Sequence, residues 1–400
     1  MGAGGAGLVA AAFASRPDRP AILIERTTDG GRKILISGGG RCNVLPAALE
    51  PEKFVTSSPA HLLRRMLRAW PLEHQKSFFE DELGIALKFE ADSQKYFPVS
   101  DRARDVRDGL VEFARRRGVE FQFGTVLEKL EPLDRGGWRV VTSKGEIETD
   151  AVVLATGGLS VPATGSDGTG LRLAEALGHT VHPLYPALAP LLTDPPIHAG
   201  LAGVSLHVRI REKCGRRVRD TRGGFLFTHK GYSGPVAMGT DPLSTGFPQM
   251  GTYVALVSWG DFSQAEWEGL LSGGNGLVAT ALGTKIPQRL ADQLMLEAFI
   301  PADRRLSDLR RFERLKLIEL LTAYPLKVSG NEGFKKAEVT GGGVALDEVD
   351  AATLESKRAP GLFMCGEMLD AYGPIGGHNF AWAWATGRSA GLAAGHVSSP

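Results

Sequence analysis

The sequence has only three cysteines, almost no net charge and no long apolar run. Cys42, Cys214 and Cys365 lie far apart and form no C-x-x-C pair, which argues against a disulfide scaffold, a zinc site or a dithiol relay. A net charge of +1 provides no overall field that would attract nucleic acid or acidic lipid. No apolar run approaches the ~18 residues of a membrane span, and no secretion signal is recognisable. We therefore expect a cytoplasmic protein that binds no metal and contacts no membrane.

Glycine, in contrast, is abundant. Many of the 51 glycines fall in five bursts, at 2–7, 38–40, 157–170, 341–343 and 373–377. Such bursts between apolar segments are typical of backbone that approaches a ligand or another segment closely. They predict a binding site built largely from main chain.

The first burst matches the pattern G-x-G-x-x-G and runs directly into an apolar stretch typical of a helix. Residues 21–25, "AILIE", are typical of a buried parallel strand, and Glu25 follows Gly7 by 18 residues. Dinucleotide-binding folds place a ribose-binding carboxylate near this point. A strand ordinarily precedes such a turn, whereas only Met1 does here. We therefore expect the natural protein to begin about 5–12 residues earlier, with an apolar strand.

Three later stretches share this character. A predicted strand at 151–155 leads into Thr156-Gly157, and another at 361–365 leads into Gly366-Glu367. Gly376-Gly377 precedes a predicted helix, whose free N–H groups suit the negative charge of a reduced flavin. Each stretch alone is equally compatible with a loop packed on a sheet. Together they indicate one ligand site.

Five stretches together resemble the BaiN-like flavoproteins, also called the aminoacetone-oxidase-like FAD-binding family. They are "GRKILISGGGRCNV" (31–44), "LATGGLSVPATGSDGTG" (154–170), "FLFTHKGYSGP" (225–235), "VTGGGV" (339–344) and "GLFMCGEMLDAYGPIGGHNFAWAW" (361–384). The resemblance spans residues 2–391. It implies an α/β, Rossmann-like FAD-binding domain of the two-dinucleotide-binding-domain type, interrupted by an inserted β-barrel and a small helical subdomain. The expected segments are 1–185 and 326–400 for the FAD-binding domain, 186–262 for the barrel and 263–325 for the helices.

The resemblance also implies which positions contact FAD. Gly2, Gly4 and Gly7 would meet the pyrophosphate, Glu25 the adenosine ribose and Val126 the adenine. Ser37, Gly38, Arg41 and Asn43 would line the flavin side, Thr156, Gly157, Gly366 and Glu367 would cross the cofactor, and Gly377, Asn379 and Phe380 would meet the isoalloxazine. The expected set also includes Gly5, Ala6, Arg26, Lys33 and Gly376. After Asn43 the sequence departs from the family, because Val44-Leu45-Pro46 stand where an acidic pair or a polar residue is common.

The leading hypothesis is an FAD-dependent oxidoreductase, reduced by NAD(P)H and reoxidised by an unsaturated small molecule or by oxygen. No second G-x-G-x-x-G follows a strand, so we expect the nicotinamide to bind transiently at the flavin. Two alternatives stay open. One is a dihydrouridine synthase acting on ribosomal RNA, with the six arginines and one lysine of 209–222 facing the RNA. The other is a flavin-binding protein without turnover. No catalytic residue is predicted; His229 and His378 suit either a proton donor or a structural hydrogen bond.

Overall fold

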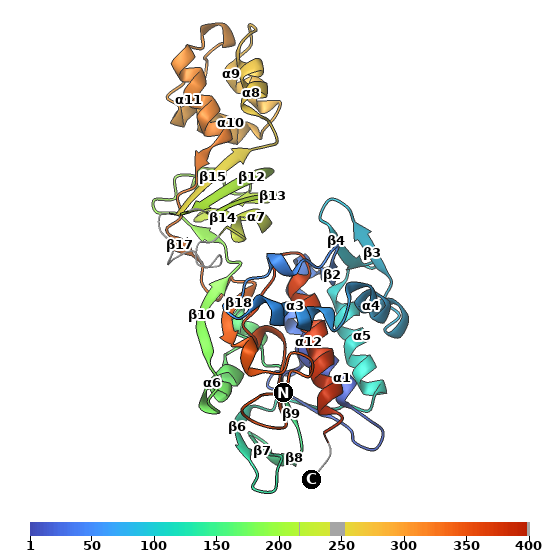
Figure 1. The fold of residues 1–400 in the computed structure, drawn as a ribbon. Helices are drawn as coiled ribbons and strands as arrows, with labels where there is room; N and C mark the ends of the chain where they lie inside the picture. The colour runs from blue at the N-terminus through green and yellow to red at the C-terminus, as the bar shows by residue number, and fades with distance from the viewer. Residues whose placement is uncertain (216, 241–252, 398–400) are drawn as a thin grey trace. The chain divides into compact units, whose positions relative to one another are not determined.

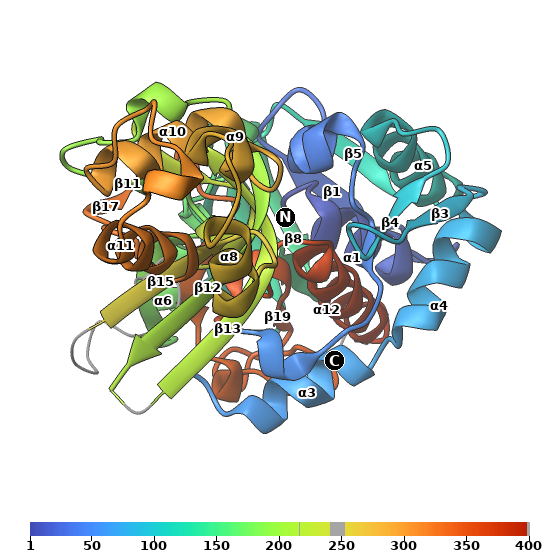
Figure 2. The same cartoon turned by 90° about the horizontal axis from the view of Figure 1, so that it is seen from above.

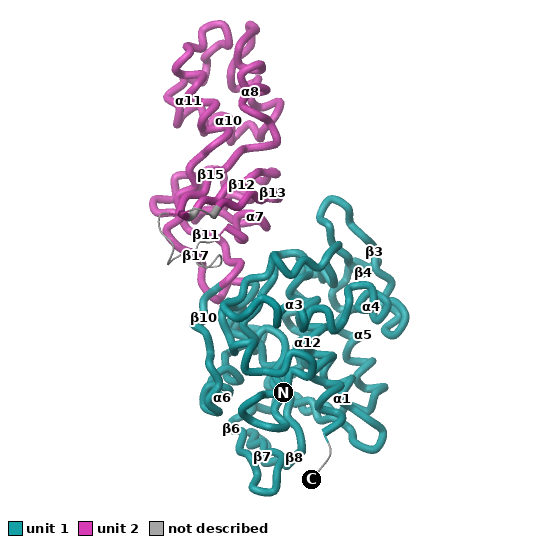
Figure 3. Tube along the Cα trace, viewed as in Figure 1, with its two compact units in different colours: residues 1–186, 338–400 teal, residues 187–337 magenta. Residues whose placement is uncertain are grey.

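The computed structural model describes residues 1–215, 217–240 and 253–397, except for the side chains of Cys214 and Arg217. The chain divides into two compact units (Figure 3). Unit 1 comprises Met1–Pro186 together with Glu338–Pro400, and unit 2 comprises Ala187–Ala337. The chain therefore leaves unit 1 once and returns to it. Among the described helices, none combines the length and apolar character needed to cross a membrane.

Unit 1 combines short parallel strand pairs with packed helices (Figure 1). Its helices are α1 (Gly5–Ala14), α2 (Arg32–Ile36), α3 (Ala60–Arg68), α4 (Leu72–Ser77), α5 (Ala103–Arg116), α6 (Thr169–Ala176) and α12 (His378–Ala394). Its strands are β1 (Ile22–Glu25), β2 (Leu45–Pro46), β3 (Leu87–Glu90), β4 (Lys95–Pro98), β5 (Glu120–Phe123), β6 (Leu127–Pro132), β7 (Trp138–Thr142), β8 (Gly145–Thr149), β9 (Val152–Leu154), β10 (Val181–Ala187), β18 (Val339–Val344) and β19 (Leu362–Met364).

Two parallel pairs flank the glycine-rich turn at 2–7. β1 pairs with β5, and β9 pairs with β19. The backbone of Met1 and Gly2 joins the pairs, since the Gly2 N–H donates to the Ile24 carbonyl (2.8 Å) and the Ala155 N–H to that of Met1 (2.9 Å). A cavity of about 750 Å³ runs between β1 and β9 beside α1. The expectation of a strand before Met1 stays a prediction.

The first and last helices of unit 1 lie side by side (Figures 1 and 2). Three glycines of α12 and its C-terminal cap, spaced at intervals of four residues, face three alanines of α1 that have the same spacing. A Cβ atom added at Gly387, Gly391 or Gly395 would come closer than 3.0 Å to the carbonyl oxygen of Ala6, Ala10 or Ala14 respectively. Real Cβ atoms do not approach other atoms so closely. The two backbones are therefore in direct contact, and because the residue numbers rise together, the helices are parallel.

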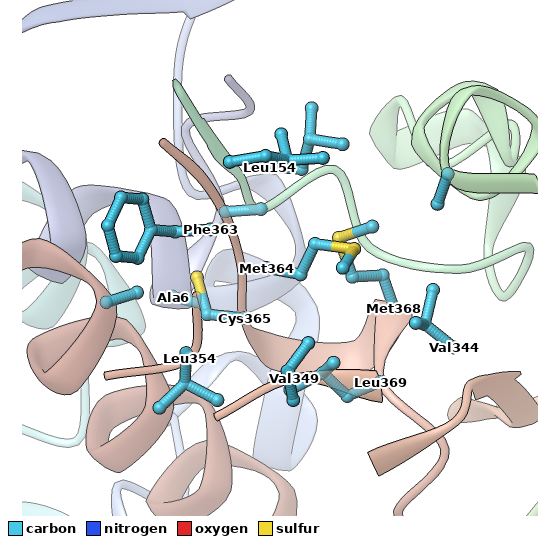
Figure 4. Packing of buried hydrophobic residues seen from close by; sticks show 14 of the residues in the cluster. Ala6, Leu154, Val344, Val349, Leu354, Phe363, Met364, Cys365, Met368 and Leu369 are labelled. Carbon is cyan, nitrogen blue, oxygen red and sulfur yellow. The ribbon is translucent and has the colours of Figure 1, made fainter. Parts of the chain in front are cut away.

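Apolar side chains fill the space around β9 and β19. Leu154, Phe363 and Met364 are at most 1% exposed, and Met368 from the turn that follows β19 is fully buried (Figure 4). Strands buried on both faces are typical of parallel sheets. This core fixes the strand ends that carry the predicted cofactor residues.

Unit 2 contains a seven-stranded antiparallel sheet and a group of helices. The strand order is β16-β15-β12-β13-β14-β11-β17. The strands are β11 (Leu191–Leu192), β12 (Ser205–Cys214), β13 (Arg217–Phe227), β14 (Gly231–Ser233), β15 (Tyr253–Trp259), β16 (Tyr324–Pro325) and β17 (Gly330–Asn331). The helices are α7 (Pro235–Met238), α8 (Gln264–Leu271), α9 (Val278–Gly283), α10 (Gln288–Glu297) and α11 (Arg311–Thr322). Closure of this sheet into a barrel stays a prediction, and residues 241–252 of the expected barrel lie outside the described residues.

Candidate functional site

The turn at 2–7 is tight on its inner side and open at Gly4. A Cβ at Gly2 would lie 2.6 Å from the Ala155 carbonyl oxygen, and one at Gly7 would overlap that of Gly2, whereas Gly4 has nothing within 4 Å. Gly4 is also the N-cap of α1, and no side chain caps the helix there. The first N–H groups of α1 are thus available to an anionic ligand, the arrangement that binds a pyrophosphate. The turn fits FAD in this respect.

The Glu25 side chain anchors the glycine turn at 2–7 by a hydrogen bond to its backbone. Its carboxylate accepts hydrogen bonds from the Ala3 N–H (2.7 Å) through Oε2, and from the N–H (2.8 Å) and hydroxyl (2.7 Å) of Thr27 through Oε1. Oε2 therefore retains room for a second donor, such as a ribose hydroxyl. The Thr125 N–H donates to the backbone carbonyl of Glu25 (2.9 Å), which brings the partly exposed Val126 to the same strand end. The ribose and adenine contacts stay predictions.

A polar network joins the ends of β9, β18 and β19 to α2. Lys33 Nζ donates to Ser160 Oγ and to Glu367 Oε2, each at 2.7 Å, and Ser160 Oγ donates to Glu367 Oε1. The Thr340 N–H donates to Glu367 (3.0 Å), and the Thr340 hydroxyl accepts from the Leu159 and Ser160 N–H groups. Lys33 and Glu367 are predicted site residues. Ser160 and Thr340 were not predicted, because their partners lie far away in the sequence.

The strand-end residues Thr156 and Gly366 border the same turn. A Cβ at Gly366 would lie 2.8 Å from the Ala6 Cβ, and a Cβ at Gly2 would lie 3.1 Å from the Thr156 Cα. The Thr156 hydroxyl is buried and has no hydrogen-bond partner among the described residues. Gly157 follows with a φ of +72°. The backbone of Thr156 thus borders the turn, whereas its hydroxyl lies against Gly170 at the start of α6.

The second end of the site is the turn before α12. Gly377 has a φ of +94°, and a Cβ there would lie 2.5 Å from the carbonyl carbon of Leu45. Contact between α1 and α12 puts Gly387 level with Ala6, so the helical rise separates this turn from Gly4 by roughly 12 Å along the helices. The starts of α1 and α12 therefore point in the same direction at different heights, a separation that suits an extended dinucleotide.

Lys95 and His378 pack beside Gly376. A Cβ at Gly376 would lie 3.3 Å from Lys95 Cε and 3.8 Å from His378 Nδ1. His378 Nδ1 is buried and has no hydrogen-bond partner among the described residues. Burial, reinforced by the charges of Lys53 and Lys95, lowers the pKa of His378 to about 4, against a smaller opposite effect of Glu50. The imidazole is therefore neutral at pH 7.

Lys95 is a cation that sequence reasoning missed, since it belongs to no recognised motif. Burial lowers the pKa of Lys95, while the charge of Glu338 acts in the opposite direction. The residue Glu338 has exposed surface, yet many protein atoms surround its carboxyl group. The resulting loss of solvent raises the pKa of Glu338, against the attraction of the Lys95 charge. Lys95 of β4 and His378 at the start of α12 thus lie beside Gly376 with perturbed pKa values, as groups at sites of proton transfer often do.

Several predicted residues already have protein partners. Arg41 donates to Glu90 and Asp101, each at 2.8 Å, and lies 4.0 Å from the centre of the Phe97 ring. Arg26 forms an ion pair with Asp167. Both guanidinium groups therefore already have carboxylate partners within the protein. Their contacts with FAD stay predictions.

Five further predicted residues have contacts within the protein, two at the start of α12 and three in the loop after α2. Asn379 exchanges hydrogen bonds with the N–H (2.8 Å) and carbonyl (2.9 Å) of Gly373, and Phe380 stacks on Trp384. Ser37 Oγ donates to the Ile34 carbonyl (2.7 Å). Gly38, with a φ of +55°, packs against Asn43, whose N–H nitrogen would lie 3.0 Å from a Cβ added there. These contacts hold the loops in place, and their roles toward FAD stay predictions.

The cysteines near the site are unreactive. Burial raises the pKa of Cys42 and of Cys365 to about 12 in each case. Thiols of this kind remain protonated at neutral pH and act as small apolar side chains. His229, in unit 2, is exposed.

The arginine-rich segment predicted to face RNA is the β12–β13 hairpin of unit 2. Arg209 and Arg211 both pair with Asp220, Arg219 pairs with Glu212, and Arg222 lies 3.5 Å from Asp261. Arg216 lies outside the described residues, and the side chain of Arg217 is not described. Most of the described positive charge on this hairpin is therefore balanced within the protein.

A glycine turn at a helix start, a strand-end carboxylate and a second glycine turn on a parallel helix define a Rossmann-type flavoprotein oxidoreductase. Residues 1–393 match the family described as the HI0933-like protein Rossmann domain. The chain belongs to this FAD-dependent family.

Two curated relatives align over nearly the whole chain. A ribosomal RNA dihydrouridine synthase of Escherichia coli K12 is 31% identical, over 96% of this chain and 94% of its own length. A 3-dehydro-bile acid delta(4,6)-reductase of Clostridium scindens is 32% identical, over 98% of each chain. Among solved structures, a 3-ketosteroid-delta4-(5alpha)-dehydrogenase from Rhodococcus jostii RHA1 is similar with a TM-score of 0.52 and 17% identity, covering 98% of this chain and 95% of that one. The last likeness concerns the fold.

Proposed function

We propose that this protein is an FAD-dependent reductase that adds a hydride and a proton across a carbon–carbon double bond conjugated to a carbonyl group. One observation carries the proposal: two relatives of equal similarity act on unrelated molecules with the same reactive unit. In uridine the C5=C6 bond is conjugated to the C4 carbonyl, and in a 3-dehydro delta(4,6) bile acid the double bonds are conjugated to the C3 carbonyl. The reaction class is therefore what we transfer to this chain.

The residues of unit 1 fit such a reaction. The open N–H groups at Gly4 would bind the pyrophosphate, and Glu25 the adenosine ribose. The turn at Gly376 and Gly377 would take the pyrimidine edge of the isoalloxazine. Bound FAD supplies the hydride.

The proton must come from the protein or from solvent. His378, neutral and without a partner at Nδ1, and Lys95, an ammonium group, face the same space beside Gly376. An ammonium near the substrate carbonyl stabilises the negative charge that develops on its oxygen, and either group can pass a proton to the neighbouring carbon. We assign Lys95 and His378 to these tasks as part of the proposal.

NAD(P)H would serve as the transient reductant. It would bind at the flavin itself, since the sequence contains one G-x-G-x-x-G that precedes a helix. An unsaturated small molecule or oxygen would reoxidise the flavin. In balance, the nicotinamide loses a hydride, the double bond gains it, and one proton is taken up.

Anaerobic stopped-flow spectroscopy tests the proposal. The purified holoprotein is reduced by NADH or NADPH and then mixed with a steroid 3-oxo-delta4 enone, a uridine-containing RNA, an alkene without a carbonyl, or oxygen. We expect rapid reoxidation by a conjugated acceptor and none by the isolated alkene. Reoxidation by oxygen alone would contradict the proposed reaction.

A further inference from the structure

We propose that the helical part of unit 2 carries a docking surface for single-stranded RNA, formed by Phe299, Phe312 and the arginines of the segment between them. These residues lie on and between α10 and α11, in the orange part of Figure 1. The inference rests on the proposed function in one respect: it names uridine within RNA as the molecule that carries the conjugated double bond.

Phe299 is the first observation. It is 90% exposed and has a φ of +58°. The Phe299 N–H donates to the Leu296 carbonyl (3.0 Å), and the Ile300 N–H to that of Met295 (2.9 Å). This pair of bonds is a Schellman motif, in which glycine is favoured at the position that Phe299 occupies. A bulky residue in the left-handed region is an outlier. The fold thus gains nothing from this ring, either by burial or by backbone preference.

The first turn of α11 presents a second exposed aromatic ring. Phe312 is 65% exposed, and Leu315, one turn further, is 47% exposed. Lys316, four residues after Phe312, is exposed on the same face and pairs with Glu319, whereas Arg311 is exposed about 100° away around the helix. The opposite face of α11 is buried in the core of unit 2. This face therefore presents two apolar side chains, Phe312 and Leu315, and the cation Lys316 to solvent.

The segment between the two rings is basic and only partly neutralised. From 300 to 311 it contains four arginines against two aspartates, and Glu313, Arg314 and Lys316 follow directly after Phe312. Arg304 pairs with Glu313 and Arg314 with Glu268. Arg305, Arg310 and Arg311 are exposed and form no ion pair within the described parts of the chain. In the β12–β13 hairpin, in contrast, each arginine with a described side chain lies beside a carboxylate, although Arg209 and Arg211 share Asp220.

Exposed aromatic rings beside unpaired arginines have the chemistry of a single-strand binding surface. Bases without a pairing partner stack on aromatic rings, and guanidinium groups bind the phosphates that connect them. A purely electrostatic site would need no exposed ring, and an apolar protein interface would be depleted of charge at its centre. The mixture on this surface favours RNA with unpaired bases over duplex RNA or a protein partner.

Fluorescence anisotropy with a labelled 12-nucleotide single-stranded RNA rich in uridine tests the surface on the full FAD-loaded chain. The decisive variant is Phe299→Gly, because glycine suits the backbone there and should raise the melting temperature. We expect this variant, and Phe312→Ala, to weaken RNA binding by about tenfold each, the loss of one stacked base. Phe89→Ala removes an exposed ring from unit 1 and serves as the matched control; it should leave the affinity unchanged.

The arginines are tested by salt dependence. Arg310→Gln together with Arg311→Gln should lower the slope of log affinity against log salt by about 1.4, as expected for two lost phosphate contacts on a single strand. Arg102→Gln, an exposed arginine of unit 1, is the control and should change neither affinity nor slope. Equal RNA affinity of the wild type and Phe299→Gly would overturn the proposal, and so would tighter binding of an RNA duplex.

The readout separates this inference from the proposed function. RNA binding needs no electron transfer, so a protein that binds RNA through this surface but reduces no conjugated double bond would refute only the reaction. A protein that reduces the steroid enone but binds the single strand no better than Phe299→Gly would refute only the surface.

Discussion

The two units reach dense packing by opposite means. In unit 1, α1 and α12 touch backbone to backbone through glycine and alanine. In unit 2, Trp259 is fully buried and packs against the rings of Phe225, Phe227 and Tyr324, with ring centres 5.4–5.5 Å away. Where glycine and alanine form the contact, the two backbones touch and the distance between the helices is fixed. Large aromatic rings instead fill the space that remains between more widely separated helices and strands. The unit that bears the predicted FAD site is the one whose helices are held at contact distance.

The largest expected effect comes from removing an aromatic ring of unit 2. Trp259→Ala should destabilise unit 2 by about 3–5 kcal/mol, since it removes a fully buried indole and leaves a cavity. Hydrogen exchange should accelerate within 187–337, while flavin absorbance, a property of unit 1, is retained. Trp259→Phe is the control and should show a smaller change. Parallel loss of flavin and of unit 2 protection would mean that the units do not behave separately.

A single methyl group in the contact between α1 and α12 should have the next largest effect. Gly391→Ala places a Cβ against the Ala10 carbonyl, which overpacks the contact at a cost of roughly 1–3 kcal/mol. Because both glycine turns depend on this contact, flavin content should fall as well. Denaturant unfolding followed by tryptophan fluorescence, with flavin absorbance after desalting, measures both.

The matched control is the same substitution in unit 2. Gly269 lies within α8 and has nothing within 4 Å of an added Cβ. Gly269→Ala should therefore raise stability by about 0.5–1 kcal/mol, the usual gain of alanine over glycine in a helix. If both substitutions change stability in the same direction, the contrast between the two packing modes is wrong.

Glu25 tests whether the close contacts of unit 1 serve the cofactor. Glu25→Ala should weaken FAD binding by about 1–3 kcal/mol, because the Ala3 and Thr27 N–H groups lose their acceptor and the ribose its proposed partner. Titration of apoprotein with FAD, followed by flavin fluorescence, gives the dissociation constant. Glu112→Ala, an exposed carboxylate on α5, is the control. Unchanged FAD affinity in Glu25→Ala would exclude the assignment.

The smallest effect is a pH dependence centred on His378. Its pKa of about 4 in the folded protein lies below the value of about 6.5 expected when unfolded, so the unfolded chain binds the proton first. Stability should therefore fall as the pH drops from about 6.5 toward 4, with a loss of roughly 1 kcal/mol between pH 8 and pH 6. Comparison of the wild type with His378→Gln isolates this contribution. A wild-type loss no greater than that of the variant would place the imidazole in solvent.

The sequence predicted those parts of the site that are each formed by one short segment of the chain. The glycine turn at 2–7, the strand ending at Glu25 and the helix after Gly377 are all recognisable from spacing. The spacing of four that links Gly387, Gly391 and Gly395 is also visible in the sequence, but its partner on α1 is not. The sequence of one α-helix does not indicate which other helix packs against it.

Long-range polar contacts could not be predicted. Thr340 and Ser160 are 180 residues apart, yet the Ser160 N–H donates to the Thr340 hydroxyl. The same limit applies to Arg41, which was expected on the flavin side: its ion pairs with Glu90 and Asp101 could not be predicted from the sequence. A cation's partner depends on the tertiary structure, because several carboxylates are chemically equivalent choices.

The contact between α1 and α12 has a consequence for how the protein is made. The ribosome produces α1 first and α12 last, and the whole of unit 2 is synthesised between them. Until residue 395 has left the ribosome, the small-residue face of α1 has no partner and the second glycine turn does not exist. Unit 2 can fold before α12 is made, whereas the cofactor domain closes only once α12 has followed. Flavin uptake would therefore report a chain that includes α12, and a chain cut before α12 would fold one unit and remain colourless.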